Sequence, residues 1–299
     1  MATLRDIRNR IAGIKSIEKI TSAMKMVSSV KLRKAQRQAE SARPFFDKIE
    51  KMLFSLALSD RHYDNPLLNT PTDKEIKNVI IFIIAGDKGL CGSFNSALFK
   101  TTDLYLKNLS TKYPGATPQL VLIGNKAIDH YNKQSYDIIY REHNAFQPLD
   151  YNLVLKSSKA VIERFLSGEA DSVEVFYNHF VNMLKQEPTS FQLFPLIPAD
   201  VLENMKEVQK GLSPDYIFEP SISILVDRLI DQYVDLKIWR ALLESNAAEQ
   251  ASRLFAMDKA TQNAHDLLKD LNLQFNNARQ AAITNEMLEI VSGAESLKK

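Results

Sequence analysis

The chain has 299 residues, a formal net charge of +2, 45% hydrophobic residues and 25% charged residues, all ordinary values for a folded protein. Its longest uninterrupted apolar run, Val79–Ala85, is far shorter than the ~20 residues that a membrane span needs. The first dozen residues carry charges where a secretory signal would be apolar. A single cysteine, Cys91, excludes an internal disulfide framework and a multi-cysteine zinc site. These features predict a soluble intracellular protein.

Charge and helix-breaking residues are unevenly distributed along the chain. Residues 1–40 contain ten Lys or Arg against three Asp or Glu, whereas residues 221–299 contain nine against eleven. A basic first segment could therefore pair with the last one or with an acidic partner. Ten of the eleven prolines lie between residues 66 and 220, and Ser221 to Ser292 are 72 residues without Gly or Pro. The two ends are thus expected to be helical and the middle to hold the turns.

The first segment, about residues 3–60, is predicted to form one long helix. Apolar residues recur every three or four positions from Leu4 to Val27, which places an apolar stripe against a partner. Thr3 can cap the start of the helix, with Asp6 three residues later as an acidic variant of the capping box. Pro44 is expected to kink the first stretch or to end it.

The middle segment, roughly residues 75–200, changes to alternating strands and helices. Strands are expected at Val79–Ala85, Leu120–Ile123 and Val173–Tyr177, with helices near 93–109 and 152–167. This alternation favours a small α/β layer with a largely parallel sheet.

The last segment, residues 221–292, would extend about 108 Å as a continuous helix. No domain of this size has such a diameter, so most of this helix cannot be covered by its own chain. Gly293 is expected to end it. If both long helices leave the middle domain on one side, they pair antiparallel and the last one overhangs. Small residues in its middle would let another helix come close: Ala247, Ala248, Ala251, Ala256 and Ala260.

A glycine-rich turn, Gly86–Gly92, lies between a predicted strand and a predicted helix. Such a turn can hold a phosphate through free backbone N–H groups, with Lys88 adding charge. Its spacing matches neither of the two common nucleotide-binding patterns. A tight structural turn is the favoured interpretation, and a phosphate site the alternative.

Other candidates for chemistry are weak. The five histidines include no pair at i, i+4, so a metal site is not expected, and Cys91 has no His near it in sequence to activate it. The basic residues Lys31, Arg33, Lys34 and Arg37 could bind nucleic acid, but no aromatic residues are interleaved with them. A solvated helix face or an acidic protein partner explains these charges better.

Four stretches are specific enough to indicate a family. They are Ile7–Val27 with its continuation Lys31–Gln36, the turn Asp87–Gly92, Glu249–Met257, and Asn277–Glu286 followed by Glu289–Ala294. In this order they resemble the gamma subunit, the central rotor shaft, of F-type ATP synthases.

The resemblance implies an α/β protein in which long N- and C-terminal helices form an antiparallel coiled coil with an inserted Rossmann-like α/β domain. The implied boundaries are 1–65, 66–215 and 216–299. The implied function is that of a non-catalytic rotor in a proton-translocating enzyme, which couples c-ring rotation to conformational changes in the catalytic beta subunits. No cofactor or metal is implied. The alternative function is a nucleotide- or phosphate-binding α/β enzyme that uses Gly86–Gly92.

The resemblance also assigns partners and contact residues. The partners are the alpha and beta subunits, with one copy of this chain per ring, the epsilon subunit and the c ring, without nucleic acid and with membrane association only through the c ring. The implied location is the cytoplasmic face of the bacterial plasma membrane. The thiol-regulated insertion of the chloroplast form is not expected, because Cys91 is the only cysteine. The residues matched to contacts with the alpha/beta ring are Met24, Arg253, Arg279, Gln280, Thr284 and Glu286, and those matched to the c-ring and epsilon side are Tyr216 and Glu219.

Overall fold

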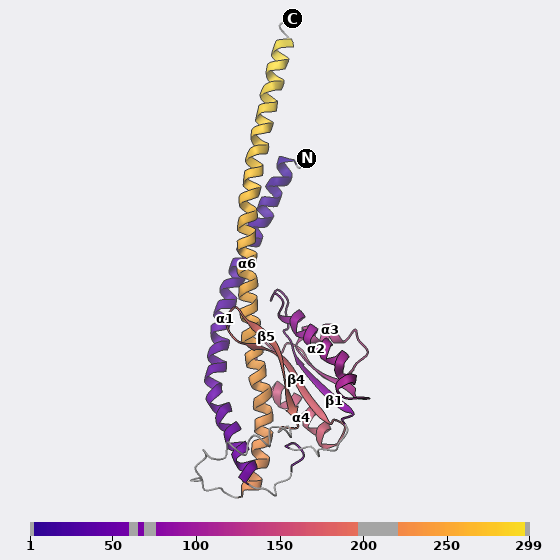
Figure 1. Cartoon of the computed structure of the whole chain (residues 1–299). Helices are drawn as coiled ribbons and strands as arrows, with labels where there is room; N and C mark the ends of the chain where they lie inside the picture. Colours follow the sequence, from indigo (N-terminus) through magenta and orange to yellow (C-terminus); the bar gives the residue numbers. More distant parts are fainter. Residues whose placement is uncertain (1–2, 60–64, 69–75, 197–220, 297–299) are drawn as a thin grey trace. The chain divides into compact units, whose positions relative to one another are not determined.

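The computed structural model describes residues 3–59, 65–68, 76–196 and 221–296. The chain divides into two compact units, residues 1–29 with 253–299, and residues 30–252. Two long helices at the ends of the chain, α1 and α6, run through both units (Figure 1). The predicted division into three parts, with boundaries at residues 65 and 215, differs in kind from these two units and stays a prediction.

Helix α1 spans Leu4–Ser59 and confirms the predicted first helix. The Asp6 N–H donates to the Thr3 hydroxyl at 3.2 Å, and the Thr3 N–H donates back to the Asp6 carboxylate at 3.1 Å. This reciprocal pair is the expected capping box, and it lowers the pKa of the Asp6 carboxyl group. Pro44 lies inside α1 and does not end it.

Helix α6 spans Ile222–Ser296 and confirms the predicted last helix. The expected stop at Gly293 is wrong, because the helix continues to Ser296. A glycine ends a helix when its backbone turns to the left-handed region. Gly293 is not among the glycines with a positive φ, so it stays in the helix.

In the first unit, α1 and α6 pair antiparallel. Residue numbers rise along α1 and fall along α6 at the same rate, in the contacts Arg8–Phe275, Glu18–His265, Thr21–Thr261 and Lys25–Asp258. The pairing buries Ile7, Met257, Ala264 and Leu271. From Arg279 to Gly293 every side chain of α6 is exposed, because α1 begins at Leu4 and reaches no further along it (Figure 1).

The second unit contains a five-stranded sheet of order β3-β2-β1-β4-β5. Its strands are β1 (Asn78–Ile84), β2 (Thr117–Ile123), β3 (Asp137–Glu142), β4 (Ser172–Phe180) and β5 (Gln186–Phe194). The first four are parallel, and β5 pairs antiparallel with β4. The three predicted strands and the largely parallel sheet are confirmed. The sequence analysis missed β3 and β5.

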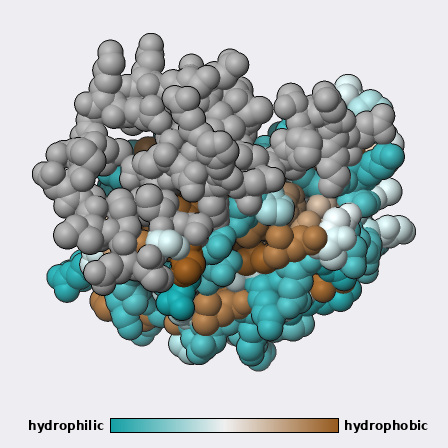
Figure 2. Space-filling view, turned by 90° about the horizontal axis from the view of Figure 1, so that it is seen from below, coloured by the Kyte–Doolittle hydropathy of each residue, from teal (hydrophilic) through white to brown (hydrophobic). Residues whose placement is uncertain are grey.

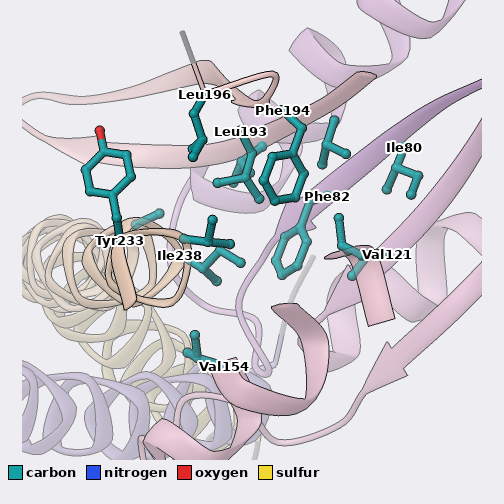
Figure 3. Close-up of a cluster of buried hydrophobic side chains, with 14 of the residues drawn as sticks. Ile80, Phe82, Val121, Val154, Leu193, Phe194, Leu196, Tyr233 and Ile238 are labelled. Carbon is teal, nitrogen blue, oxygen red and sulfur yellow. The ribbon is translucent and has the colours of Figure 1, made fainter. Parts of the chain in front are cut away.

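Helices cover both faces of this sheet. Helices α2 (Phe94–Lys112) and α3 (Asn125–Tyr131) pack on one face, and α4 (Tyr151–Leu166) packs with α6 on the other. Alternate residues of β1 enter the two cores, Ile81 on the α2 side and Phe82 on the α4 side. Figure 3 shows Phe82, Val121, Val154 and Ile238 converging in the second core. Burial on both faces explains why β1 is a continuous apolar run.

In the part of the chain that the structure describes, no helix is long and apolar enough to cross a membrane. Figure 2 shows mostly hydrophilic residues on the described part of one face, with smaller hydrophobic patches between them. Such a mixture is ordinary for a protein surface in contact with water.

Candidate functional site

The Gly86–Gly92 turn is held in place by a buried carboxylate. Asp87 accepts hydrogen bonds from three backbone N–H groups, those of Asn125 at 3.1 Å, Ala145 at 3.2 Å and Phe146 at 2.8 Å. The turn therefore fastens the start of α3 and the loop after β3 to the end of β1.

The same turn packs against α6. The Ser252 hydroxyl donates to the Cys91 carbonyl at 2.6 Å, and Ala248 packs against Cys91 and Phe94 in a small buried cluster. A Cβ at Gly86 would lie 3.1 Å from the Glu249 carboxylate. The small residues of α6 were expected to let another helix come close, and at Ala248 the neighbour includes the Cys91 turn of the α/β domain.

This geometry disfavours a phosphate. The Gly86 N–H already donates to the Asn95 side-chain oxygen at 2.9 Å, so it is not free to bind an anion. The carboxylates of Asp87 and Glu249 also lie at the turn and would repel one. The interpretation as a structural turn is supported.

A polar cluster lies where α6 packs on the β4–β5 hairpin. The sequence analysis did not predict it. Glu244 is buried, and its carboxylate lies 2.6 Å from His179 Nδ1 and accepts from the Tyr177 hydroxyl at 3.3 Å and from Arg240 Nε at 3.1 Å. Desolvation is the main reason why the pKa of Tyr177 is raised. Arg240 and Glu244 at i, i+4 were the signal in the sequence, but their partners on β4 come only from the fold.

The predicted contact residues differ in exposure. Met24 is half-buried in the paired stretch, and Arg253 is only 8% exposed. Arg279, Gln280, Thr284 and Glu286 are exposed on the unpaired end of α6, where the Thr284 hydroxyl donates to the Gln280 carbonyl at 2.9 Å. Tyr216 and Glu219 lie outside the described residues. The structure thus brings four of the eight together on one helical segment.

The unpaired end of α6 also exposes large apolar side chains. Met287 is 62% exposed and Ile290 69% exposed, and they are accompanied by Ile283, Leu288 and Val291. A contiguous apolar surface of this kind on an exposed helix marks a place of interaction. In the described residues, no group of three or more His, Cys, Asp or Glu side chains is placed to hold a metal ion.

Comparison with known proteins decides the family. The family described as ATP synthase matches residues 3–297. The ATP synthase gamma chain of Chlorobium limicola is 40% identical over 299 residues, with all of both chains covered. That of Chlorobium phaeobacteroides is 42% identical and covers all of this chain and 99% of its own. The chain belongs to the ATP synthase gamma chain family.

Solved structures agree with this membership. A chain from the central stalk and c ring of the Tetrahymena thermophila mitochondrial ATP synthase matches 81% of this chain and 99% of its own length, at 25% identity and a TM-score of 0.57. A chain from the Euglena gracilis mitochondrial enzyme matches 98% of this chain and 94% of its own, at 19% identity and a TM-score of 0.61, and supports the fold alone.

Family membership confirms the resemblance read from the four stretches. This gamma chain is the central stalk rotor of an F-type ATP synthase and is a non-catalytic subunit. The alternative of a phosphate-binding enzyme is excluded, in agreement with the two carboxylates at the Gly86–Gly92 turn.

Proposed function

We propose that this gamma chain couples rotation of the c ring to conformational changes in the catalytic beta subunits of a proton-translocating ATP synthase. The observation that carries the proposal is the unpaired end of α6, where every side chain from Arg279 to Gly293 is exposed. A helix end with large exposed apolar residues is suited to lie inside a sleeve formed by other subunits.

The mechanism is mechanical. Each proton that crosses the membrane supplies about 2.3 kcal/mol per 100 mV, and the shaft has to transmit several such steps. Two packed helices resist twist and bending better than one, which suits the paired stretch of α1 and α6. An asymmetric shaft inside a three-fold ring contacts each beta subunit differently, and so biases each toward a different conformation.

The contact residues follow from the same proposal. Arg279, Gln280, Thr284 and Glu286 are exposed and free to meet polar groups of the alpha/beta ring. Met24 and Arg253 are proposed to lie against an acidic loop of the beta subunit. Because Arg253 is only 8% exposed, the loop would contact just the exposed edge of its side chain. Tyr216 and Glu219 are proposed for the c-ring and epsilon side.

The proposed partners are the alpha, beta and epsilon subunits and the c ring. The similar chain from Tetrahymena thermophila was solved with a central stalk and c ring, and the one from Euglena gracilis with OSCP, F1 and a c ring. The curated relatives at about 40% identity come from bacteria such as Chlorobium limicola. The cytoplasmic face of a bacterial plasma membrane is therefore the proposed location, reached through the c ring.

Co-purification tests the partners. The tagged chain is recovered from gently solubilised membranes of its own cell, and the accompanying proteins are identified and quantified. We expect alpha and beta subunits at three copies each per gamma chain, with epsilon and c. Recovery of the gamma chain without them would contradict the proposal.

Substitution tests the unpaired end of α6. The double variant Met287→Ser and Ile290→Ser is expected to lower proton-coupled ATP synthesis severalfold in membrane vesicles, because it weakens the apolar contact with the ring. Leu184→Ser is the control, since Leu184 is 80% exposed at the tip of the β4–β5 hairpin and is not part of the proposed contact. Equal synthesis rates in both variants and the wild type would count against the proposed contact.

A further inference from the structure

A cavity of about 160 Å³ lies among α1, α6 and the β4–β5 hairpin, wholly within residues 30–252. Its walls combine apolar side chains, such as Phe46 on α1, Phe191 on β5 and Tyr233 on α6, with ionisable groups. The ionisable groups besides Lys237 are Glu50, His179, Arg240 and Glu244. The amine of Lys237 on α6 belongs to the same lining. The cavity thus places one primary amine beside aromatic rings and several ionisable groups.

Lys237 is half-buried, and the contacts of its amine are long. Its Nζ lies 5.2 Å from the centre of the Phe191 ring and 5.3 Å from that of Tyr233. Its hydrogen bond goes to the Gln192 carbonyl, at a long 3.5 Å. Among the described residues, no carboxylate lies within ion-pair distance of this amine.

Charged groups face Lys237 from each element around it. Glu50 of α1 attracts the ammonium form, but its carboxylate is already the acceptor of the Tyr233 hydroxyl at 2.7 Å. Arg240, one turn along α6, repels the ammonium form. On the β4 side, His179 and Tyr177 are both engaged by Glu244.

These surroundings leave much of the amine in its reactive form. Desolvation, opposed by Glu50 and assisted by Arg240, lowers the pKa of Lys237 to about 8. At pH 7.5 its free-amine fraction is then larger than that of a lysine with an ordinary pKa. The neutral amine is the nucleophilic form.

We propose that Lys237 is a site of reversible carbamylation by carbon dioxide. The cavity is large enough for a molecule of three heavy atoms. Carbon dioxide is uncharged and apolar, so it can enter between the aromatic walls without the desolvation penalty of an ion.

The reaction needs no further reagent. The nitrogen lone pair of Lys237 forms a bond to the carbon of carbon dioxide, one C=O electron pair moves onto oxygen, and one N–H proton leaves to solvent. The products are a carbamate anion and one proton. Arg240 repels the ammonium form of Lys237 but attracts the carbamate anion. The Glu50 carboxylate, in contrast, repels the carbamate. The charge of the Lys237 side chain, which lies among α1, α6 and the β4–β5 hairpin, thus changes from positive to negative.

Trapping of the carbamate on the full-length chain tests the proposal. The protein is equilibrated with ¹³C-labelled carbon dioxide and bicarbonate at pH 7.5 and alkylated with triethyloxonium, and its peptides are analysed by mass spectrometry. A free peptide amine in the same reaction shows that trapping works. We expect a labelled ethyl carbamate on Lys237 at least tenfold above that on exposed lysines such as Lys51 and Lys156.

Two variants with opposite expected effects separate the chemistry from loss of folding. Glu50→Gln keeps an acceptor for the Tyr233 hydroxyl and removes the repulsion, so it should raise the yield on Lys237 severalfold. Arg240→Gln removes the attraction and should lower it severalfold. Lys237→Arg abolishes the label at this position, and circular dichroism verifies that each variant is folded.

Three outcomes would overturn the proposal. They are equal labelling of all lysines, absence of label on Lys237 while the control amine is trapped, and a ¹³C signal of bound bicarbonate without a trapped adduct. The last would mean that the cavity holds the anion without a covalent bond.

Discussion

The hydroxyl of Thr261 on α6 lies 2.8 Å from the hydroxyl of Thr21 on α1 and donates a hydrogen bond to it. Thr21 in turn donates to the Ile17 carbonyl at 3.0 Å. Two short side chains that pair in this way let the helices approach closely while no hydroxyl is left without a partner. The contact also favours this register of the antiparallel pair, because a shift by one turn would separate the two hydroxyls.

Removal of one hydroxyl from this pair should destabilise the pairing. Thr21→Val keeps the shape but removes the acceptor, and we expect a loss of about 0.5–1.5 kcal/mol in the free energy of unfolding. Thr261→Val should cost a similar amount. The double variant should cost less than the sum, because both partners of the bond are then absent. Urea unfolding followed by circular dichroism measures all four proteins, and strict additivity would contradict a direct bond.

Gly124 should not tolerate any side chain. It follows β2 with φ +93°, and a Cβ there would lie 2.1 Å from the Ala85 carbonyl oxygen. We expect Gly124→Ala to cost more than about 3 kcal/mol or to prevent folding. The matched control is Gly115→Ala, because Gly115 has φ +81° with no atom within 4 Å and should lose only about 1 kcal/mol. Thermal unfolding of the two variants separates the effect of the Cβ collision from that of backbone strain. Equal losses of stability in both variants would contradict a collision at Gly124.

Asp87 should matter for the structure of the α/β domain. Asp87→Asn replaces one carboxylate oxygen with an NH₂ group that cannot accept from the backbone, so we expect a loss of about 1–3 kcal/mol. Asp129→Asn is the control, because that exposed carboxylate pairs with Lys126 at 3.2 Å and should change stability by less than about 0.5 kcal/mol. Hydrogen exchange of the Ala145 and Phe146 amides provides a local measurement. Unchanged protection in Asp87→Asn would show that the carboxylate does not hold the loop.

Lys237 should make stability depend on pH in a defined window. Its pKa is about 8 in the folded chain against 10.5 for the ordinary side chain, so the unfolded chain binds more protons between these values and stability rises with pH there. We expect Lys237→Met to be more stable than the wild type below pH 8, with the difference shrinking as the pH rises to 10.5. The measurement uses buffer free of carbon dioxide. Leu236→Met, a neutral change at the same cavity, should differ from the wild type by an amount that does not vary with pH.

Much of the fold follows from local pattern. The capping box at Thr3 and Asp6, the long apolar periodicity and the absence of Gly and Pro predicted α1 and α6 to within a few residues. The continuous apolar run of β1 predicted a strand buried on both faces. These signals are local because helix periodicity and two-sided burial are written in consecutive residues.

Other elements carry no comparable local signal. Strand β3 is short and half-exposed, and β5 contains polar residues and Pro188, as is typical of strands at the edge of a sheet. Glycine is the residue that most often ends a helix, yet α6 continues past Gly293, which does not have a positive φ. Edge strands and helix ends depend on neighbours that are distant in sequence.

Two long helices, the parallel α/β layer between them and the family of the chain could be predicted without coordinates, because they depend on local periodicity and on ordered motifs. The tertiary structure alone decided which groups meet. It placed Asp87 beneath three backbone amides, Glu244 among its partners on β4, and Lys237 in an aromatic cavity. Burial and hydrogen bonding between distant segments depend on how the helices and the sheet pack, and no local sequence pattern encodes that packing.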